Sequence, residues 1–218
     1  MDNNFWHERW ALNDIGFHLN QVNPQLLKFW PKLKSTMADT VFIPLCGKSK
    51  DIIWLSKQVK QAYACELSQQ AIDGFFNDNK IEPAISQHTR YIKYQYANIT
   101  IFCGDIFQLN PEELESCTLI YDRASFIAFP DGMRQRYVET LELLFPQPHK
   151  RLLITLEYPQ SLMNGPPFSI SADDVKHLFA SQYKIQCLAS NSVIDQYKRF
   201  KDKGIDTLYE HIFTLQKN

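Results

Sequence analysis

The stretch that most constrains the fold is Val41–Ser68, which reads VFIPLCGKSKDIIWLSKQVKQAYACELS. It begins with a short apolar run suited to a buried strand, passes through a turn that contains Gly47, and continues with apolar residues at helical spacing. A second apolar run follows and ends in Glu66. This order of strand, tight turn, helix, strand and terminal acid is typical of a nucleotide-binding βαβ unit, and it predicts a parallel α/β sheet.

The turn also indicates which ligand would suit the unit. Glu66 lies nineteen residues beyond Gly47, close to the spacing at which an acid accepts hydrogen bonds from ribose hydroxyls. Only one glycine stands in this turn, whereas NAD-binding turns use several to approach a diphosphate. The turn therefore favours a ligand with a ribose but no phosphate, such as S-adenosylmethionine, over NAD. The alternative is a plain βαβ unit in which Glu66 only caps the next helix.

Composition excludes several other classes of function. The 218 residues suffice for one domain with a sizeable core. A net charge of −1 gives no electrostatic basis for binding nucleic acid or an anionic membrane, and no apolar run approaches the ~20 residues of a membrane span. The five cysteines form no C-x-x-C pair and the polar N-terminus resembles no export signal, so we expect reduced thiols, a cytoplasmic location and no metal site.

The first 36 residues precede the first core strand. Trp6 and Trp10 fall on one face of a short predicted helix, and a second helix is predicted over Val22–Leu33 with Asn23 as its cap and Pro24 at its first position. The aromatic residues either pin this segment to the body of the protein or make it a lid over a ligand, and both can hold at once.

Strands and helices alternate through most of the remaining chain, which indicates a parallel sheet covered on both faces within a single domain, residues 1–218. The last two strands are joined by a polar stretch, so we expect the final strand to run antiparallel. The predicted elements are a helix over Ser68–Asn77, a hairpin of Arg90–Gln95 and Ile99–Phe102, a strand at Leu119–Tyr121, a helix from Asp131, a strand at Arg151–Tyr158, a helix after Ser171, and strands at Tyr183–Leu188 and Thr207–Leu215.

The carboxyl ends of the parallel strands bring chemistry-bearing residues to one edge of the sheet. Pro44–Lys48, Glu66, Gly104-Asp105 and Asp122-Arg123 all follow predicted strands. Ligands bind at this edge in open α/β sheets. Two acids at separate strand ends, one for a ribose and one for a base, predict a nucleoside site.

Eight short motifs are spread along nearly the whole chain: FWHERW (5–10), IGFH (15–18), PLCGKSKD (44–51), ELS (66–68), GDIF (104–107), YDRA (121–124), GPPF (165–168) and GID (204–206). They are similar to those of bacterial thiopurine S-methyltransferases, and the PLCGKS turn together with YDRA is specific to that family.

The resemblance implies a class I S-adenosylmethionine-dependent methyltransferase (Rossmann-like) fold. Such a fold has a seven-stranded mixed sheet with an antiparallel last strand, here with residues 1–36 as an N-terminal helical lid. Phe17 would line the acceptor pocket, and Arg123 would stabilise an anionic acceptor. The expected cofactor contacts are Trp10, Leu45, Gly47, Glu66, Asp105, Ile106 and Arg123.

The implied activity is transfer of a methyl group from S-adenosylmethionine to the sulfur of thiopurines and other small aromatic or heterocyclic thiols, by a monomer. Because the methyl donor carries a strong leaving group, the protein mainly aligns the reactants and excludes water, and no catalytic base is assigned. The alternatives are methylation of selenium or tellurium oxyanion derivatives or thiocyanate-like ions, a non-catalytic nucleoside-binding module, and, more distantly, an NAD-dependent enzyme. For Arg123 the alternative role is an ion pair with Asp122 or a neighbouring carboxylate.

Overall fold

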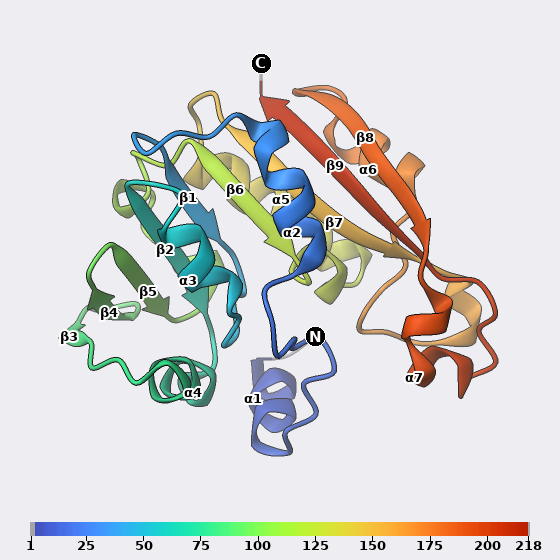
Figure 1. Cartoon of the computed structure of the whole chain (residues 1–218), viewed down its shortest axis with the longest axis horizontal. Helices are drawn as coiled ribbons and strands as arrows, with labels where there is room; N and C mark the ends of the chain where they lie inside the picture. Colours follow the sequence, from blue (N-terminus) through green and yellow to red (C-terminus); the bar gives the residue numbers. More distant parts are fainter. Residues whose placement is uncertain (1–2, 218) are drawn as a thin grey trace.

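The strands form one mixed sheet of nine, in the order β3-β4-β5-β2-β1-β6-β7-β9-β8 (Figure 1), in a computed structural model that describes residues 3–217. The central five strands are parallel, as predicted, and β9 runs antiparallel between β7 and β8. The expected antiparallel last strand is therefore confirmed. These seven strands are β1 (Thr40–Ile43), β2 (Gln61–Glu66), β5 (Ile99–Cys103), β6 (Leu119–Arg123), β7 (Lys150–Glu157), β8 (Tyr183–Ser192) and β9 (Tyr209–Lys217).

The expected number of seven strands is wrong, because two further strands extend the sheet beyond β5. β4 (Ile92–Tyr96) and β5 form the predicted hairpin, whose turn places Ala97 at φ +48°. β3 (Ala84–Gln87) pairs antiparallel with β4 and was not predicted. All four of its residues are exposed, so burial imposes no alternating pattern from which the strand could be recognised.

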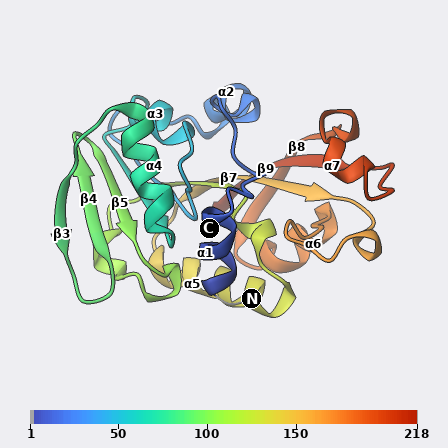
Figure 2. The same cartoon turned by 90° about the horizontal axis from the view of Figure 1, so that it is seen from below.

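Helices cover both faces of the sheet. α2, α3 and α4 lie on one face, α5 and α6 lie on the other, and α1 lies below the carboxyl ends of the parallel strands (Figures 1 and 2). The second predicted helix is shorter than expected, because it continues as a 3₁₀ turn over Trp30–Leu33. The helices are α1 (Asn3–Ala11), α2 (Pro24–Phe29), α3 (Asp51–Ser56), α4 (Gln69–Asn79), α5 (Asp131–Leu144), α6 (Ala172–Phe179) and α7 (Lys198–Lys201).

Polar side chains cap the starts of three helices, and the first of these caps, Asn23, is the one that the sequence predicts. The Asn23 side chain accepts hydrogen bonds from the backbone N–H groups of Gln25 and Leu26. Ser68 caps α4, and Ser171 forms a capping box with Asp174 at the start of α6. Each cap supplies an acceptor for N–H groups that have no partner inside the helix, and this fixes where the helix begins.

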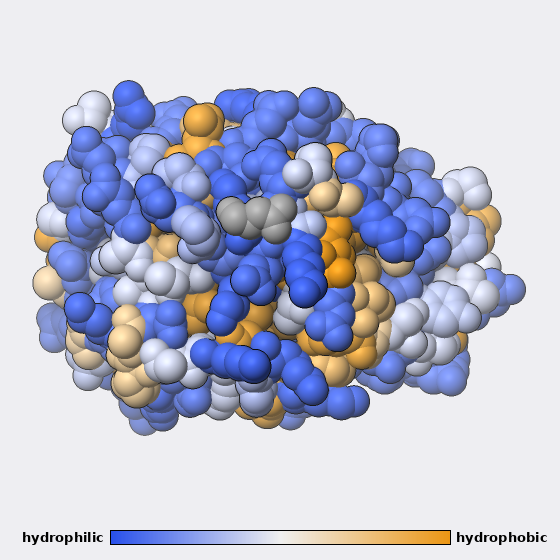
Figure 3. Space-filling view, turned by 90° about the horizontal axis from the view of Figure 1, so that it is seen from above, coloured by the Kyte–Doolittle hydropathy of each residue, from blue (hydrophilic) through white to orange (hydrophobic). Residues whose placement is uncertain are grey.

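The core consists of two apolar layers separated by the sheet. β1 is buried along its whole length, with Val41 and Ile43 in the layer under α2 and α3 and Phe42 in the layer under α5. Successive side chains of a strand point to opposite faces, so one short strand contributes to both layers. From the edge opposite α1 the surface is mostly hydrophilic, with apolar side chains visible in a few places (Figure 3).

No helix among residues 3–217 is long and apolar enough to cross a membrane. The predicted segment 1–36 and the predicted domain 1–218 include Met1, Asp2 and Asn218, which lie outside the described residues.

A buried histidine makes the stability of the fold depend on pH. His149 is 3% exposed, and its ring nitrogens lie 3.0 Å from the Gln147 carbonyl oxygen and 3.0 Å from the Tyr183 hydroxyl. Burial is the main reason that the pKa of His149 is lowered to about 4, and the nearby Arg151 and Lys217 charges contribute to this shift. Between this pKa and the ordinary value near 6.5 the unfolded chain binds the proton and the folded protein does not.

We therefore expect the contribution of His149 to stability to be complete above pH 6.5 and to be lost as the pH falls towards 4. Between pH 7.5 and 5 the loss should be about 2 kcal/mol. Urea unfolding at these two pH values should show that His149→Gln removes about this much of the wild-type difference. His88→Gln, in which the replaced ring is exposed, should keep the wild-type difference; equal behaviour of the two variants would contradict the assignment.

Candidate active site

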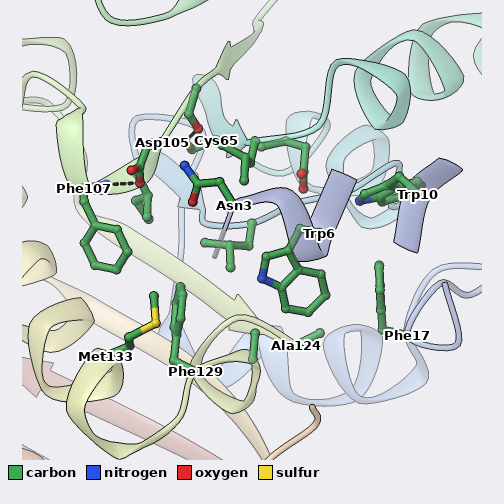
Figure 4. A pocket seen from close by; sticks show the side chains of 16 residues that line it. Asn3, Trp6, Trp10, Phe17, Cys65, Asp105, Phe107, Ala124, Phe129 and Met133 are labelled. Atoms are coloured by element: carbon green, nitrogen blue, oxygen red, sulfur yellow. Dashed lines mark hydrogen bonds between the residues drawn. The ribbon is translucent and has the colours of Figure 1, made fainter. Parts of the chain in front are cut away.

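A cavity of about 710 Å³ lies at the carboxyl ends of the parallel strands, between the sheet and α1. Phe107, Phe129 and Met133 lie on one side of it, and the aromatic rings of the N-terminal segment lie on the other (Figure 4). Most of the residues predicted to form the site line this cavity. They are Trp10, Phe17, Leu45, Glu66, Asp105 and Ile106.

The turn after β1 is folded tightly against the end of β2. The Cys46 N–H donates to the Cys65 carbonyl oxygen at 2.9 Å. Leu45 has φ +44° and Gly47 has φ +53°, both in the left-handed region. A non-glycine residue such as Leu45 pays about 1–2 kcal/mol for this conformation, so surrounding contacts hold the turn in place. A Cβ on Gly47 would lie 3.1 Å from Cζ2 of Trp10, which shows that α1 packs directly on the turn.

Glu66 joins this turn to the start of α4. Its Oε2 accepts a hydrogen bond from the Gly47 N–H at 2.8 Å, and its Oε1 accepts one from the Ser68 N–H at 2.8 Å. Burial raises the pKa of the Glu66 carboxyl, and these amide donors act in the opposite direction. A carboxylate has about four acceptor positions, so the side chain keeps capacity to accept further hydrogen bonds on the cavity side.

Asp105 caps a short 3₁₀ helix beside the cavity. Its Oδ1 accepts from the Phe107 N–H at 3.0 Å, the dashed line in Figure 4, and this places Ile106 with 5% exposure against the cavity. Asp105 therefore both caps the turn and forms part of the cavity wall. Ile106, Phe129 and Met133 make the neighbouring wall apolar and suited to a planar ring.

The opposite wall is aromatic. The ring centroid of Phe17 lies 6.1 Å from that of Trp6 and 5.7 Å from that of Trp10, both edge to face. Such contacts stabilise aromatic pairs by about 0.5–1.5 kcal/mol beyond the burial of their surface. The residues of α1 and the loop after it thus form one side of the cavity as a packed unit.

A second cavity of about 780 Å³ adjoins the first, and Trp6, Phe17, Ala124 and Ala128 line both. Pro166 and Pro167 of the predicted GPPF motif line the second cavity. Its polar side chains include Arg123 and Arg9, which belong to the YDRA and FWHERW motifs, and several that lie outside the motifs. These are Asp14, Tyr197, Arg199 and Glu210.

Arg123 lies outside the first cavity, at the wall of the second. Its Nη1 and Nη2 donate to the Phe17 carbonyl oxygen at 3.2 and 3.4 Å, and its Nε lies 3.4 Å from Oδ2 of Asp51. The expected alternative, an ion pair with a carboxylate, is therefore present, and the partner is Asp51. Asp122 points to the other face of β6, where the Tyr137 hydroxyl donates to it at 2.9 Å.

Gly47 and Arg123 both line a third, smaller cavity of about 380 Å³. Phe17 and Leu45 line this cavity as well as the first. Lys48 and His18 also line it. Burial lowers the pKa of His18, and the Lys48 and Arg123 charges lower it further, so the imidazole is neutral at pH 7. Among residues 3–217 no group of three or more His, Cys, Asp or Glu is placed to hold a metal ion.

The sequence matches one protein family over its whole length. The family model described as Thiopurine S-methyltransferase (TPMT) matches residues 1–218. A thiopurine S-methyltransferase of Pseudomonas fluorescens is 39% identical over 217 residues, covering the whole of this chain and 98% of that protein. One from Shewanella woodyi is 40% identical over 221 residues, covering the whole chain and 99% of the relative.

Solved structures with low sequence identity share the fold. A SAM-dependent methyltransferase from Anabaena variabilis has a TM-score of 0.68 at 14% identity, covering 99% of this chain and 95% of its own. The magnesium protoporphyrin IX methyltransferase from Synechocystis PCC 6803, solved with bound SAH, has a TM-score of 0.65 at 13% identity, with both chains fully covered. These likenesses confirm the predicted class I methyltransferase fold.

The conformation of Gly47 yields a prediction for the turn. Gly47→Ala places a Cβ at positive φ and against Trp10, so it should lower the free energy of unfolding by about 1 kcal/mol or more. Gly132→Ala is the matched control, because a Cβ there meets no atom within 4 Å and alanine favours the helix. Urea unfolding should show destabilisation of the first variant only; an unaffected Gly47→Ala protein would mean that the turn is not held as described.

Proposed function

The chain belongs to the thiopurine S-methyltransferase family, and on this premise we propose that it transfers a methyl group from S-adenosylmethionine to the sulfur of thiopurines and other small aromatic or heterocyclic thiols. The observation that carries the proposal beyond family membership is the pair of adjoining cavities. One has the features of a nucleoside site, and the other opens beside it with cationic and aromatic side chains.

The first and third cavities fit S-adenosylmethionine. The apolar wall at Ile106 suits an adenine ring, Asp105 lies beside it, and Glu66 keeps acceptor capacity for ribose hydroxyls. When bound, S-adenosylmethionine supplies an electrophilic methyl group on a sulfonium. We propose that Trp10, Leu45, Gly47, Glu66, Asp105, Ile106 and Arg123 hold it.

The second cavity fits an aromatic thiol. Phe17 offers a ring at the junction of the two cavities, and the Arg123 and Arg199 guanidinium groups bring positive charge to the wall. Cationic side chains stabilise a thiolate relative to the thiol, and the thiolate is the better nucleophile. We propose that Phe17 and Arg123 contact the acceptor and that apolar neighbours such as Ile127 and Leu156 exclude water from it.

We also propose that residues 1–36 act as a lid of a single domain, because α1 and Phe17 supply one side of both cavities.

All five cysteines lie among the described residues and are unpaired, which supports a reducing compartment such as the cytoplasm. A monomer is proposed as well, and light scattering should give the mass of one chain.

The activity is tested by incubating the protein with methyl-labelled S-adenosylmethionine and 6-mercaptopurine or 4-nitrothiophenol. Label should appear in the S-methyl product. Arms with selenite, tellurite and thiocyanate, followed by headspace analysis, test the other acceptor classes. Binding of S-adenosylhomocysteine without transfer to any acceptor would support a nucleoside-binding module, and binding of NADH alone would overturn the methyltransferase proposal.

Glu66→Gln tests the nucleoside site separately from catalysis. The amide removes the charge and replaces one acceptor oxygen by a donor, which faces the Gly47 or Ser68 N–H. We expect isothermal titration to show S-adenosylhomocysteine binding about 10- to 100-fold more weakly, the equivalent of about 1–3 kcal/mol. Glu139→Gln, on the exposed face of α5, should bind like the wild type. Unchanged affinity of Glu66→Gln would remove this residue from the site.

A further inference from the structure

One carboxylate in the wall of the second cavity uses only one of its two oxygens in hydrogen bonds within the fold. Glu210, the second residue of β9, lines the cavity and is 8% exposed. Its Oε2 accepts a hydrogen bond from Gln25 Nε2 at 2.8 Å. Within residues 3–217 its side chain makes no other hydrogen bond, so Oε1 is left without a donor.

The neighbouring cationic side chains do not form an ion pair with the Glu210 carboxylate. Arg123 is close enough to lower the pKa of the Glu210 carboxyl, but its guanidinium donates to the Phe17 carbonyl oxygen and pairs with Asp51. The other carboxylate in this wall, Asp14, has a side chain that is 61% exposed and is paired with Arg9. Glu210 is therefore the buried acid of this cavity with an acceptor oxygen available to a ligand.

The chemistry of heterocyclic thiols supplies a ligand group for that oxygen. In the neutral form of a thiopurine or a 2-mercaptobenzimidazole, the proton lies on a ring nitrogen next to the thiocarbonyl carbon. Methylation at sulfur has to release this N–H proton, whereas a thiophenolate carries no such proton. A buried carboxylate can both accept the N–H hydrogen bond and receive the proton.

We propose that Glu210 binds the ring N–H of heterocyclic thione acceptors and takes its proton as the sulfur is methylated. The sulfur lone pair forms the new bond to the methyl carbon, and the methyl–sulfonium bond pair stays on the departing sulfur. The N–H bond pair enters the ring as a C=N bond, the π pair of the C=S bond becomes a lone pair on the sulfur, and the proton goes to Oε1 of Glu210. This role rests on the proposed function and narrows its preferred acceptors to heterocycles with an N–H beside the thiocarbonyl.

The surroundings of Glu210 suit a proton acceptor. Burial raises the pKa of its carboxyl, which the Gln25 hydrogen bond and the Arg123 charge oppose, and a raised pKa makes a carboxylate a stronger base. Tyr197 also lines the cavity near Glu210, since this carboxylate contributes to raising the pKa of the tyrosine. On the apolar side, Ile154 and Leu156 of β7 flank the strand that carries Glu210 and provide a surface for a planar ring.

Glu210→Gln tests the proposal, because the amide keeps the size of the side chain and its oxygen can still accept from Gln25 or a ring N–H, but it cannot take a proton. For 2-mercaptobenzimidazole we expect kcat/KM to fall by about 100-fold, mostly in kcat. For 4-nitrothiophenol, which lacks a ring N–H and is ionised at neutral pH, the change should stay within about twofold. The matched control is Glu157→Gln on the adjacent strand, whose carboxylate pairs with His211 and does not line the cavity. It should match the wild type with both thiols.

Binding provides a readout that does not depend on turnover. Trp6 lines both cavities, so tryptophan quenching in the presence of S-adenosylhomocysteine can follow acceptor binding. Replacing a charge-assisted hydrogen bond by a neutral one should weaken 2-mercaptobenzimidazole binding by about 3- to 10-fold and leave 4-nitrothiophenol binding unchanged.

Two outcomes would overturn the role of Glu210: equal losses of kcat/KM with both thiols, which would show a structural effect on the cavity, and no loss with either. A wild-type protein that methylates neither thiol would instead overturn the proposed function itself. The two failures are distinguishable because the wild type serves as the reference in every arm.

Discussion

The site depends on one buried carboxylate, Glu66, and on the hydrogen bonds that it accepts from two backbone N–H groups. Its bond to the Gly47 N–H ties the turn after β1 to the end of β2, and its bond to the Ser68 N–H ties the same point to the start of α4. Trp10 packs on Gly47, so the position of α1 depends on the turn as well. A single carboxyl group thereby sets the relative positions of the turn, β2 and α4 directly, and that of α1 through the turn.

A second set of buried polar contacts decides where the two cavities meet. Arg123 reaches from the end of β6 to the Phe17 carbonyl oxygen and to Asp51 at the start of α3. This holds the Phe17 ring at the boundary that both cavities share. Asp122, one residue earlier, points to the opposite face and accepts from Tyr137, because successive side chains of a strand alternate. Two adjacent charged residues therefore serve different layers of the molecule.

Local patterns were sufficient for the parts of the fold in which burial and capping impose a repeat. The strand–turn–helix unit around Gly47, the cap at Asn23, and the hairpin of β4 and β5 all match their predictions. β3 was missed because its side chains are all exposed. The residues of the second cavity were missed for another reason: Tyr197, Arg199 and Glu210 lie in a polar stretch and at the start of β9, with no motif that marks them.

By itself the sequence determined the order of strands and helices apart from β3 and α7, the family, and the residues that follow the carboxyl ends of the parallel strands. Those properties depend on residue type and spacing along the chain. Only the tertiary structure decided that Asp51, rather than the adjacent Asp122, pairs with Arg123, and that Glu210 enters the wall of the acceptor cavity. These contacts join residues from distant parts of the chain, and the direction of each side chain is set by strand pleat and sheet order, which no local pattern specifies.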